Sequence, residues 1–162
     1  MSKKTFFTAG PAALFPTFEK HLHHAVNEQI GSISHRSEAY KKIHQHTDEQ
    51  LRELLTIPAE SAIMFTGSAS EVWERILLNL VELESYHLIN GSFSKKFYEY
   101  AIKLKKYAHK LEKPAGEGFS YDEPEIPEFT ELICTTHNET STGVQMREPD
   151  IQRLKRSNGN RL

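Results

Sequence analysis

The stretch Ala62-Ile63-Met64-Phe65-Thr66-Gly67-Ser68-Ala69-Ser70 decides which fold the chain is expected to have. Its apolar run, residues 63–65, is typical of a short buried strand. After the Gly-Ser-Ala-Ser turn, apolar residues recur at the spacing of one helical face, and they are Ala69, Val72, Trp73, Ile76, Leu77, Leu80 and Val81. The stretch therefore predicts a strand over residues 62–66 that leads directly into an amphipathic helix over residues 69–83.

A junction of this kind is suited to hold a phosphate group. Small residues at the turn let the backbone approach a ligand, and the free N–H groups and positive dipole end of the following helix face an anion there. The hydroxyl of Ser68 or Ser70 would add a further donor. Because many strand–helix junctions carry Gly and Ser for turning and capping alone, this stretch by itself leaves both interpretations open.

The composition is that of an ordinary globular domain. The 162 residues can bury one core, and the 20 basic and 22 acidic side chains are interspersed with a net charge of −2, which predicts no nucleic-acid partner. Cys134 is the single cysteine, which excludes an internal disulfide and favours a reducing compartment. The sequence contains neither a signal peptide nor an apolar run long enough to span a membrane. We therefore expect a cytoplasmic protein without a membrane partner.

The last residues are not typical of the end of a domain. Ser157-Asn158-Gly159-Asn160 is a strong turn signal, and Arg161-Leu162 looks like the start of another element. We therefore expect this chain to be the N-terminal part of a longer protein.

Helical and strand patterns alternate along the rest of the chain. The stretch 113–128, rich in Pro, Gly and acidic residues, is expected to be a surface loop. Strands separated by helices of about 12–15 residues form parallel crossovers, so the pattern predicts an α/β fold with a mostly parallel sheet flanked by helices on both faces. The further elements are helices at about 17–30, from 38 to a stop at Pro58, from about 93 to 104 and at about 149–155, and strands at 86–89, 107–111 and 132–135.

Three loops with polar or aromatic residues follow strands of this predicted sheet. They are residues 67–70, 90–94 and 136–143. Ligands of such sheets bind at the carboxyl ends of the strands, so a phosphate cradle, an aromatic ring and a group of hydroxyls and amides would meet at one edge. This combination predicts a site for a planar phosphorylated cofactor. Each loop taken alone also has a purely structural explanation. Phe93 could fill part of the core, and the polar run at 136–143 could be a turn whose side chains bond to its own backbone.

Five short motifs resemble the N-terminal half of the class V aminotransferases, which use pyridoxal phosphate in a fold-type-I large domain. In chain order they are Thr8-Ala9-Gly10-Pro11-Ala12, Ser34-His35-Arg36, Gly67-Ser68-Ala69-Ser70, Asn90-Gly91-Ser92-Phe93 and His137-Asn138-Glu139-Thr140-Ser141-Thr142-Gly143. The first and last motifs are most similar to those of the phosphoserine branch. The third motif and the Ser-Thr-Gly ending of the last also resemble the alanine–glyoxylate and serine–pyruvate branch.

The resemblance implies a role for four residues in binding the cofactor. Ala69 and Ser70 would hold the phosphate, the first through its N–H and the second through its N–H and hydroxyl. Phe93 stands where the family has the aromatic residue that stacks on the pyridine ring, although the phosphoserine branch usually has Trp there. Thr140 matches the residue whose hydroxyl donates to the phenolic oxygen of the ring.

The resemblance also implies how substrate is bound. His35 and Arg36 match the pair that binds the anionic group of the substrate, and in this family they act from the neighbouring subunit of a homodimer. The Lys that forms the Schiff base and the Asp that pairs with the pyridinium nitrogen are expected beyond Leu162, so these 162 residues hold no catalytic residue. We expect an N-terminal extended segment and helix over residues 1–30, and the first part of the large domain over residues 31–162.

The leading hypothesis is therefore a transaminase that moves an amino group between phosphoserine and 2-oxoglutarate, as in serine biosynthesis. The alternatives are an alanine–glyoxylate or serine–pyruvate type transaminase, a class V lyase, or a truncated domain that binds a partner without chemistry. A metal site is not expected. The histidines at 21–24 and at 44–46 include i,i+2 pairs that point to different sides of a helix, and two ligands at i,i+3 do not complete a site.

Overall fold

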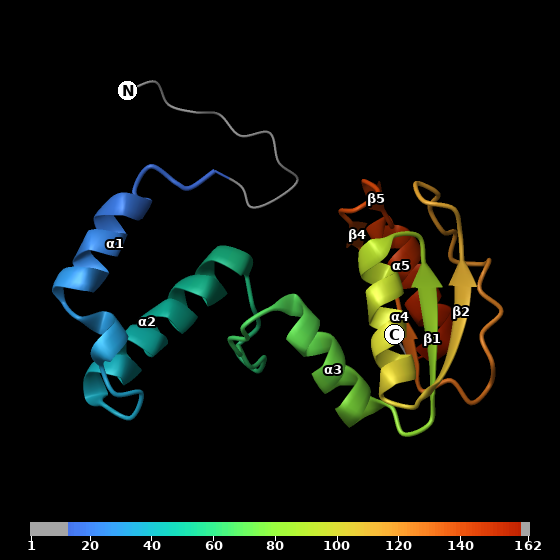
Figure 1. The fold of residues 1–162 in the computed structure, drawn as a ribbon, viewed down its shortest axis with the longest axis horizontal. Coiled ribbons are helices and arrows are strands. Elements are labelled where there is room, and N and C mark those ends of the chain that lie inside the picture. Colours follow the sequence, from blue (N-terminus) through green and yellow to red (C-terminus); the bar gives the residue numbers. More distant parts are fainter. Residues whose placement is uncertain (1–12, 160–162) are drawn as a thin grey trace. The chain divides into compact units, whose positions relative to one another are not determined.

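The computed structural model describes residues 13–159, so the Thr8–Ala12 motif lies outside the described residues. The chain forms two compact units, one up to Phe65 and one from Thr66 (Figure 1). The elements are α1 (Phe18–Asn27), η1 (Ile30–Ser32), α2 (Glu38–Leu55), α3 (Ala69–Leu80), β1 (Glu84–Ile89), α4 (Ser92–Lys103), β2 (Tyr107–Glu112), β3 (Leu132–Cys134), β4 (Asn138–Glu139), β5 (Val144–Gln145) and α5 (Glu148–Asn158).

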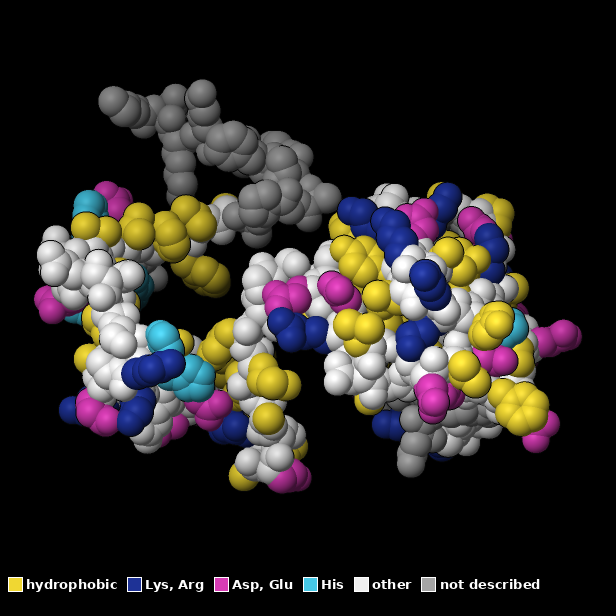
Figure 2. Space-filling view, turned by 60° about the horizontal axis from the view of Figure 1, so that its bottom comes forward, with side chains coloured by type: hydrophobic (Ala, Val, Ile, Leu, Met, Phe, Trp, Pro, Cys, Tyr) yellow, Lys and Arg dark blue, Asp and Glu magenta, His cyan; other side chains and the backbone are white. Residues whose placement is uncertain are grey.

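The first unit contains the two predicted helices, α1 and α2, with the short η1 between them. Ser37 caps α2 by accepting a hydrogen bond from the Tyr40 N–H at 3.2 Å, which fixes where the helix begins. Thr56 has a left-handed backbone with φ of 55°, so α2 ends before the predicted stop at Pro58. Neither α1 nor α2 buries a residue, and Figure 2 shows apolar side chains at the surface of this unit.

The predicted strand at residues 62–66 is wrong. This segment forms no strand, and the Met64 and Phe65 side chains are 82% and 59% exposed. An apolar run can become a strand only where a second strand satisfies its backbone N–H and C=O groups, and no described segment pairs with this one. Phe65 instead contacts the ring of His44 edge-to-face, with ring centroids 5.6 Å apart.

The second unit confirms the predicted parallel sheet. Its strands lie in the order β2-β1-β3, and β1 runs parallel to both neighbours, with Glu84 opposite Tyr107 and Ser85 opposite Leu132. The central strand is buried from Ser85 onward, as is typical of a parallel strand covered on both faces. A short antiparallel ribbon of β4 and β5, which the sequence patterns did not predict, follows β3.

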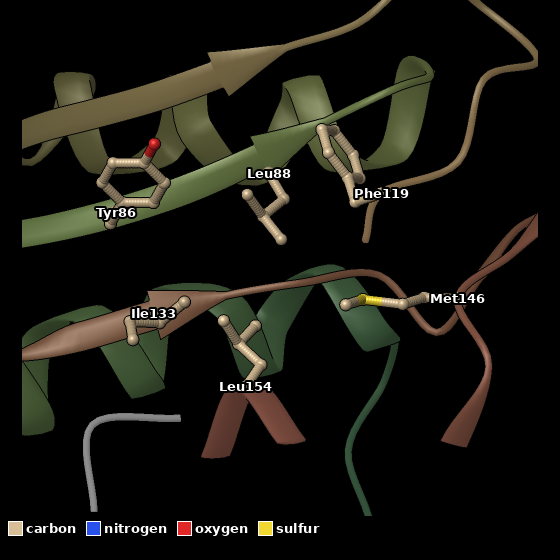
Figure 3. Packing of buried hydrophobic residues seen from close by; sticks show 6 residues of the cluster. All are labelled: Tyr86, Leu88, Phe119, Ile133, Met146 and Leu154. Carbon is tan, nitrogen blue, oxygen red and sulfur yellow. The ribbon is translucent and has the colours of Figure 1, made fainter. Parts of the chain in front are cut away.

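Helices cover both faces of this sheet. On one face, α3 and α4 enclose a core of Leu77, Val81 and Ala101. On the other, α5 and the loops contribute to a second core, in which Phe119 comes from the stretch predicted as a surface loop (Figure 3). The members of this second core are Tyr86, Leu88, Phe119, Ile133, Met146 and Leu154.

His87 of β1 is the one histidine buried in the described core, with 1% of its surface exposed. Its Nε2 lies 2.9 Å from the Ser85 hydroxyl, and its ring meets those of Phe97 and Tyr98 edge-to-face. Nδ1 has no hydrogen-bond partner among the described residues. Because burial withholds water from the charged imidazolium, it lowers the pKa of His87 to about 4.

This burial predicts a stability that falls on mild acidification. His87 takes up a proton near pH 6.5 in the unfolded chain and only near pH 4 in the folded chain. The stability that depends on a neutral His87 is therefore fully present above pH 6.5 and is lost as the pH falls toward 4. The loss amounts to roughly 3 kcal/mol of unfolding free energy. Urea unfolding of the native chain and of His87→Gln between pH 7 and 4 measures it. The native chain should show the steeper dependence, and equal slopes would contradict the account.

Candidate functional site

The candidate site lies at the carboxyl edge of the sheet, where β1 ends at Ile89. Asn90 and Gly91 lead from this strand into α4, and the loop after β3 brings Glu139 of β4 beside the start of that helix. The Asn90 side chain is fixed by donating to the Glu117 carbonyl at 2.9 Å. The fold thus brings together two of the three loops that the sequence places at this edge.

The Glu139 carboxylate joins these two loops. It is fully buried and accepts hydrogen bonds from the Ser94 N–H at 2.8 Å, the Ser94 hydroxyl at 2.9 Å and the Phe93 N–H at 3.4 Å. From its own loop it accepts the Ser141 hydroxyl at 2.6 Å and the Ser141 N–H at 3.3 Å. Burial alone would raise the pKa of this carboxyl, but the hydrogen bonds from Ser141 and Ser94 outweigh it and hold the pKa below its usual range.

The position of the carboxylate constrains the residues next to it. A Cβ on Gly91 would lie 2.3 Å from the Glu139 Cγ, so only glycine lets the backbone pass there. The Ser141 hydroxyl, while donating to Glu139, accepts the Ser92 N–H at 2.8 Å. The first N–H groups of α4 therefore already have acceptors inside the protein.

Phe93 and Thr140 lie on either side of this junction. Phe93 is the second residue of α4, its side chain is 42% exposed, and its ring contacts no other aromatic ring in the described part of the chain. Thr140 directly follows Glu139, is exposed, and its hydroxyl has no hydrogen bond to another described residue. A free ring face and a free hydroxyl thus stand on two loops that one carboxylate holds together.

The start of α3 differs from the start of α4 because the N–H groups of its first two residues are open. The Ser68 hydroxyl accepts the Glu71 N–H at 3.3 Å, and the Glu71 carboxylate accepts the Gly67 N–H at 3.0 Å. The N–H groups of Ala69 and Ser70 and the Ser70 hydroxyl have no acceptor within residues 13–159. Of these two helix starts, α3 is therefore the one that can receive an anion.

Glu71 is the negative group nearest to this opening. Its carboxylate pairs with Arg75, and hydrogen bonds from Arg75 and from Gly67 hold its pKa below the usual range. The guanidinium offsets the charge that Glu71 would otherwise present to a bound anion. The open donors at Ala69 and Ser70 thus fit a phosphate group.

His35 and Arg36 lie in the first unit, in the turn before α2. The Arg36 N–H donates to the Ser34 hydroxyl at 3.3 Å, and both side chains are exposed. Glu38, the nearest acid in the sequence, pairs with Lys41 at 2.6 Å. Among the described residues, no carboxylate neutralises Arg36, so its guanidinium is available to an anionic ligand.

Two other features of the edge do not add to the predicted site. A cavity of about 220 Å³ is bordered by neither Phe93 nor Thr140, and its lining is Ile89, Asn90, Gly91, Ser92, Lys95, Glu112, Lys113, Ala115 and Thr142. Cys134 is buried, which raises its pKa to about 12 and makes it a core residue rather than a nucleophile. Within the described ranges, no three His, Cys, Asp or Glu side chains are arranged to hold a metal ion.

Sequence reasoning missed the role of Glu139. It grouped this residue with a polar run that turn formation could explain. The available signal was an acid in a loop at the carboxyl edge of a parallel sheet, where a neighbouring loop starts a helix with an unsatisfied N-terminus.

Comparisons with known proteins support the motif resemblance. No family model matches the chain. It is 38% identical over 108 residues to the phosphoserine aminotransferase of Streptococcus thermophilus and 31% identical over 141 residues to that of Corynebacterium glutamicum. These matches cover 62% and 86% of this chain, which spans only 30% and 37% of the two relatives.

A solved structure agrees with these relatives. The phosphoserine aminotransferase of Cytophaga hutchinsonii is 43% identical and superposes with a TM-score of 0.90, over 95% of this chain and 43% of that one. No helix of the described residues is both long and apolar enough to cross a membrane. In sequence and in fold, the chain is homologous to the N-terminal region of the phosphoserine aminotransferases, as its motifs predict.

Proposed function

We propose that the protein to which this chain belongs is a class V, pyridoxal-phosphate-dependent transaminase that moves an amino group between phosphoserine and 2-oxoglutarate. The observation that carries the proposal is the contrast between the two helix starts. The N-terminal amides of α4 are satisfied by Glu139 and Ser141, whereas those of Ala69 and Ser70 at α3 are open to a phosphate. The likeness to phosphoserine aminotransferases supports the choice of substrate.

The residues present fit the cofactor. Ala69 and Ser70 would hold its phosphate through two N–H groups and a hydroxyl, and the exposed Phe93 ring would support the flat face of the pyridine. The free hydroxyl of Thr140 would donate to the phenolic oxygen. When bound, pyridoxal phosphate supplies an electron-withdrawing ring for amino transfer, and the protein supplies the orientation of that ring.

Substrate binding is assigned to the first unit. Arg36 offers a two-pronged guanidinium to phosphate or carboxylate, and His35 adds a donor when protonated. We propose that this pair acts across a homodimer, so that each active site takes residues from two subunits. The Lys of the Schiff base and the Asp partner of the ring nitrogen remain predicted beyond Leu162, and a cytoplasmic location remains a prediction from the single cysteine.

Absorbance of the complete gene product with pyridoxal phosphate tests the proposal. We expect a cofactor band that changes on addition of phosphoserine, with 2-oxoglutarate restoring it. A change with alanine or serine and turnover of glyoxylate, but no response to phosphoserine, would instead favour the alanine–glyoxylate and serine–pyruvate branch. If no cofactor band forms at all, the protein is a binding domain without this chemistry.

Replacing Arg36 by Ala should weaken the binding of phosphoserine and leave the affinity for the cofactor unchanged. Each lost hydrogen bond to a charged group costs about 1.5–3 kcal/mol, so KM should rise roughly 10- to 100-fold. Steady-state kinetics and a cofactor titration measure the two effects. Arg156→Ala, an exposed arginine of α5, is the matched control and should change neither.

Mixed dimers test whether the site is shared. An Arg36→Ala subunit, whose KM is raised, is combined with a Ser70→Ala, Thr140→Ala subunit, whose cofactor site is defective, and activity is measured at a phosphoserine concentration well below the raised KM, where each variant by itself has little activity. If Arg36 serves the site of the other subunit, one site of the mixed dimer has all of its residues and activity returns. Mixed dimers that form but recover no activity would contradict the shared site.

A further inference from the structure

The Glu139 side chain connects two residues that are far apart in the sequence. Its Oε2 accepts the N–H and hydroxyl of Ser94, while its Oε1 accepts Ser141 and, at 3.4 Å, the Phe93 N–H. These bonds hold the start of α4, and with it the backbone of Phe93. Thr140 is held because its two neighbours in the chain are Glu139 and Ser141, which are bonded to each other. The carboxylate is the point at which the two loops meet.

A carboxylate suits this position better than any other side chain. It presents only acceptors, and all five of the groups that face it are N–H or O–H donors. A glutamine of the same shape would turn an NH₂ group toward some of these donors and leave them unsatisfied in a buried place. Hydrogen bonds to an ionised acceptor are also shorter and stronger than neutral ones, as the 2.6 Å bond from Ser141 illustrates.

Glu139 does not face the solvent side of the site. Its side chain is fully buried, and the backbone at Gly91 passes directly over its Cγ. A ligand that reaches the exposed Phe93 ring or the exposed Thr140 hydroxyl therefore does not touch the carboxylate. Any effect of Glu139 on such a ligand must act through the position of these two residues.

We propose that Glu139 is a positioning residue, which holds the Phe93 ring and the Thr140 hydroxyl in a fixed relation so that one bound cofactor ring meets both. This inference rests on the proposed function. Hydrogen bonds from Ser141 and Ser94 outweigh burial and keep the pKa of the Glu139 carboxyl below its usual range, so this carboxylate stays ionised throughout the neutral range.

The test compares Glu139→Gln with Glu131→Gln. The Glu131 carboxylate accepts the N–H groups of Leu83 at 2.7 Å and Glu84 at 2.9 Å, at the opposite end of β1 from the site. Both variants remove a carboxylate that accepts backbone N–H groups, but only one of them lies beside the proposed site. The complete gene product is titrated with pyridoxal phosphate, and the induced circular dichroism of the bound cofactor is recorded together with the unfolding transition.

We expect Glu139→Gln to weaken cofactor affinity about tenfold or more and to reduce the induced dichroism per bound cofactor. Glu131→Gln should lower stability while leaving both cofactor signals as in the native protein. Amide exchange without cofactor should quicken at residues 93 and 94 in Glu139→Gln only. Should Glu139→Gln fail to fold, Ser141→Ala, which removes the hydroxyl that donates to Glu139 at 2.6 Å, is judged by the same signals.

The outcomes separate this inference from the proposed function. Native protein that binds the cofactor, with Glu139→Gln indistinguishable from it, overturns the positioning role and leaves the proposed function intact. Equal loss of dichroism in Glu131→Gln also overturns it, because the effect is then general loosening. Native protein that binds no pyridoxal phosphate overturns the proposed function and the positioning role together.

Discussion

The buried carboxylate of Glu139 is the interaction on which the arrangement of the site depends. It satisfies the start of α4 from inside the protein and so removes that helix end from competition for an external anion. The start of α3 keeps the N–H groups of Ala69 and Ser70 free, which is why these residues are proposed to hold the cofactor phosphate. The glycine at position 91 follows from the same constraint, since any side chain there would overlap Glu139.

The parallel sheet makes this interaction possible. In parallel strands the carboxyl ends share one edge, so the loop after β1 and the loop after β3 meet although about 45 residues separate them in the sequence. Cores on both faces cover the strands, and they consist of apolar side chains. Figure 3 shows the core that contains Phe119 and Leu154. His87 is a buried polar residue of this framework, and because its Nδ1 has no partner among the described residues and its pKa is lowered by burial, it links the stability of the framework to pH.

Much of the fold could be predicted from apolar spacing. The helices α1 to α5 and the three parallel strands were confirmed. In the second unit the helices and strands have apolar faces that pack together in two cores, and in the first unit α2 has a local start signal in the cap at Ser37. The strand at residues 62–66 was not confirmed, since strand formation depends on a partner that the run itself does not specify. Phe119 could not be placed either, because the apolar residues of this polar loop, among them Phe119, Tyr121 and Ile126, show neither a helical nor a strand period.

Part of the candidate site could also be predicted from the sequence. Motif order placed Phe93 and Thr140 on neighbouring loops, and the structure brings those loops together. The residue that joins them was not identified, because its role arises from donors on α4 and on its own loop that only the fold assembles. Spacing along the chain carries no signal for such a contact. Local chemistry, by contrast, did indicate the open donors at the start of α3.

The most direct test of this account is the titration of the Glu139 carboxyl itself, followed by carbon NMR of the side chain in the folded protein. The account predicts a midpoint below the ordinary value of 4.5, with the Ser94 amide signal changing in the same step as its acceptor is protonated. A midpoint at or above 4.5, or a Ser94 amide that does not respond, would mean that the five donors do not hold an ionised carboxylate. That result would contradict the proposed role of Glu139 in holding the two loops together.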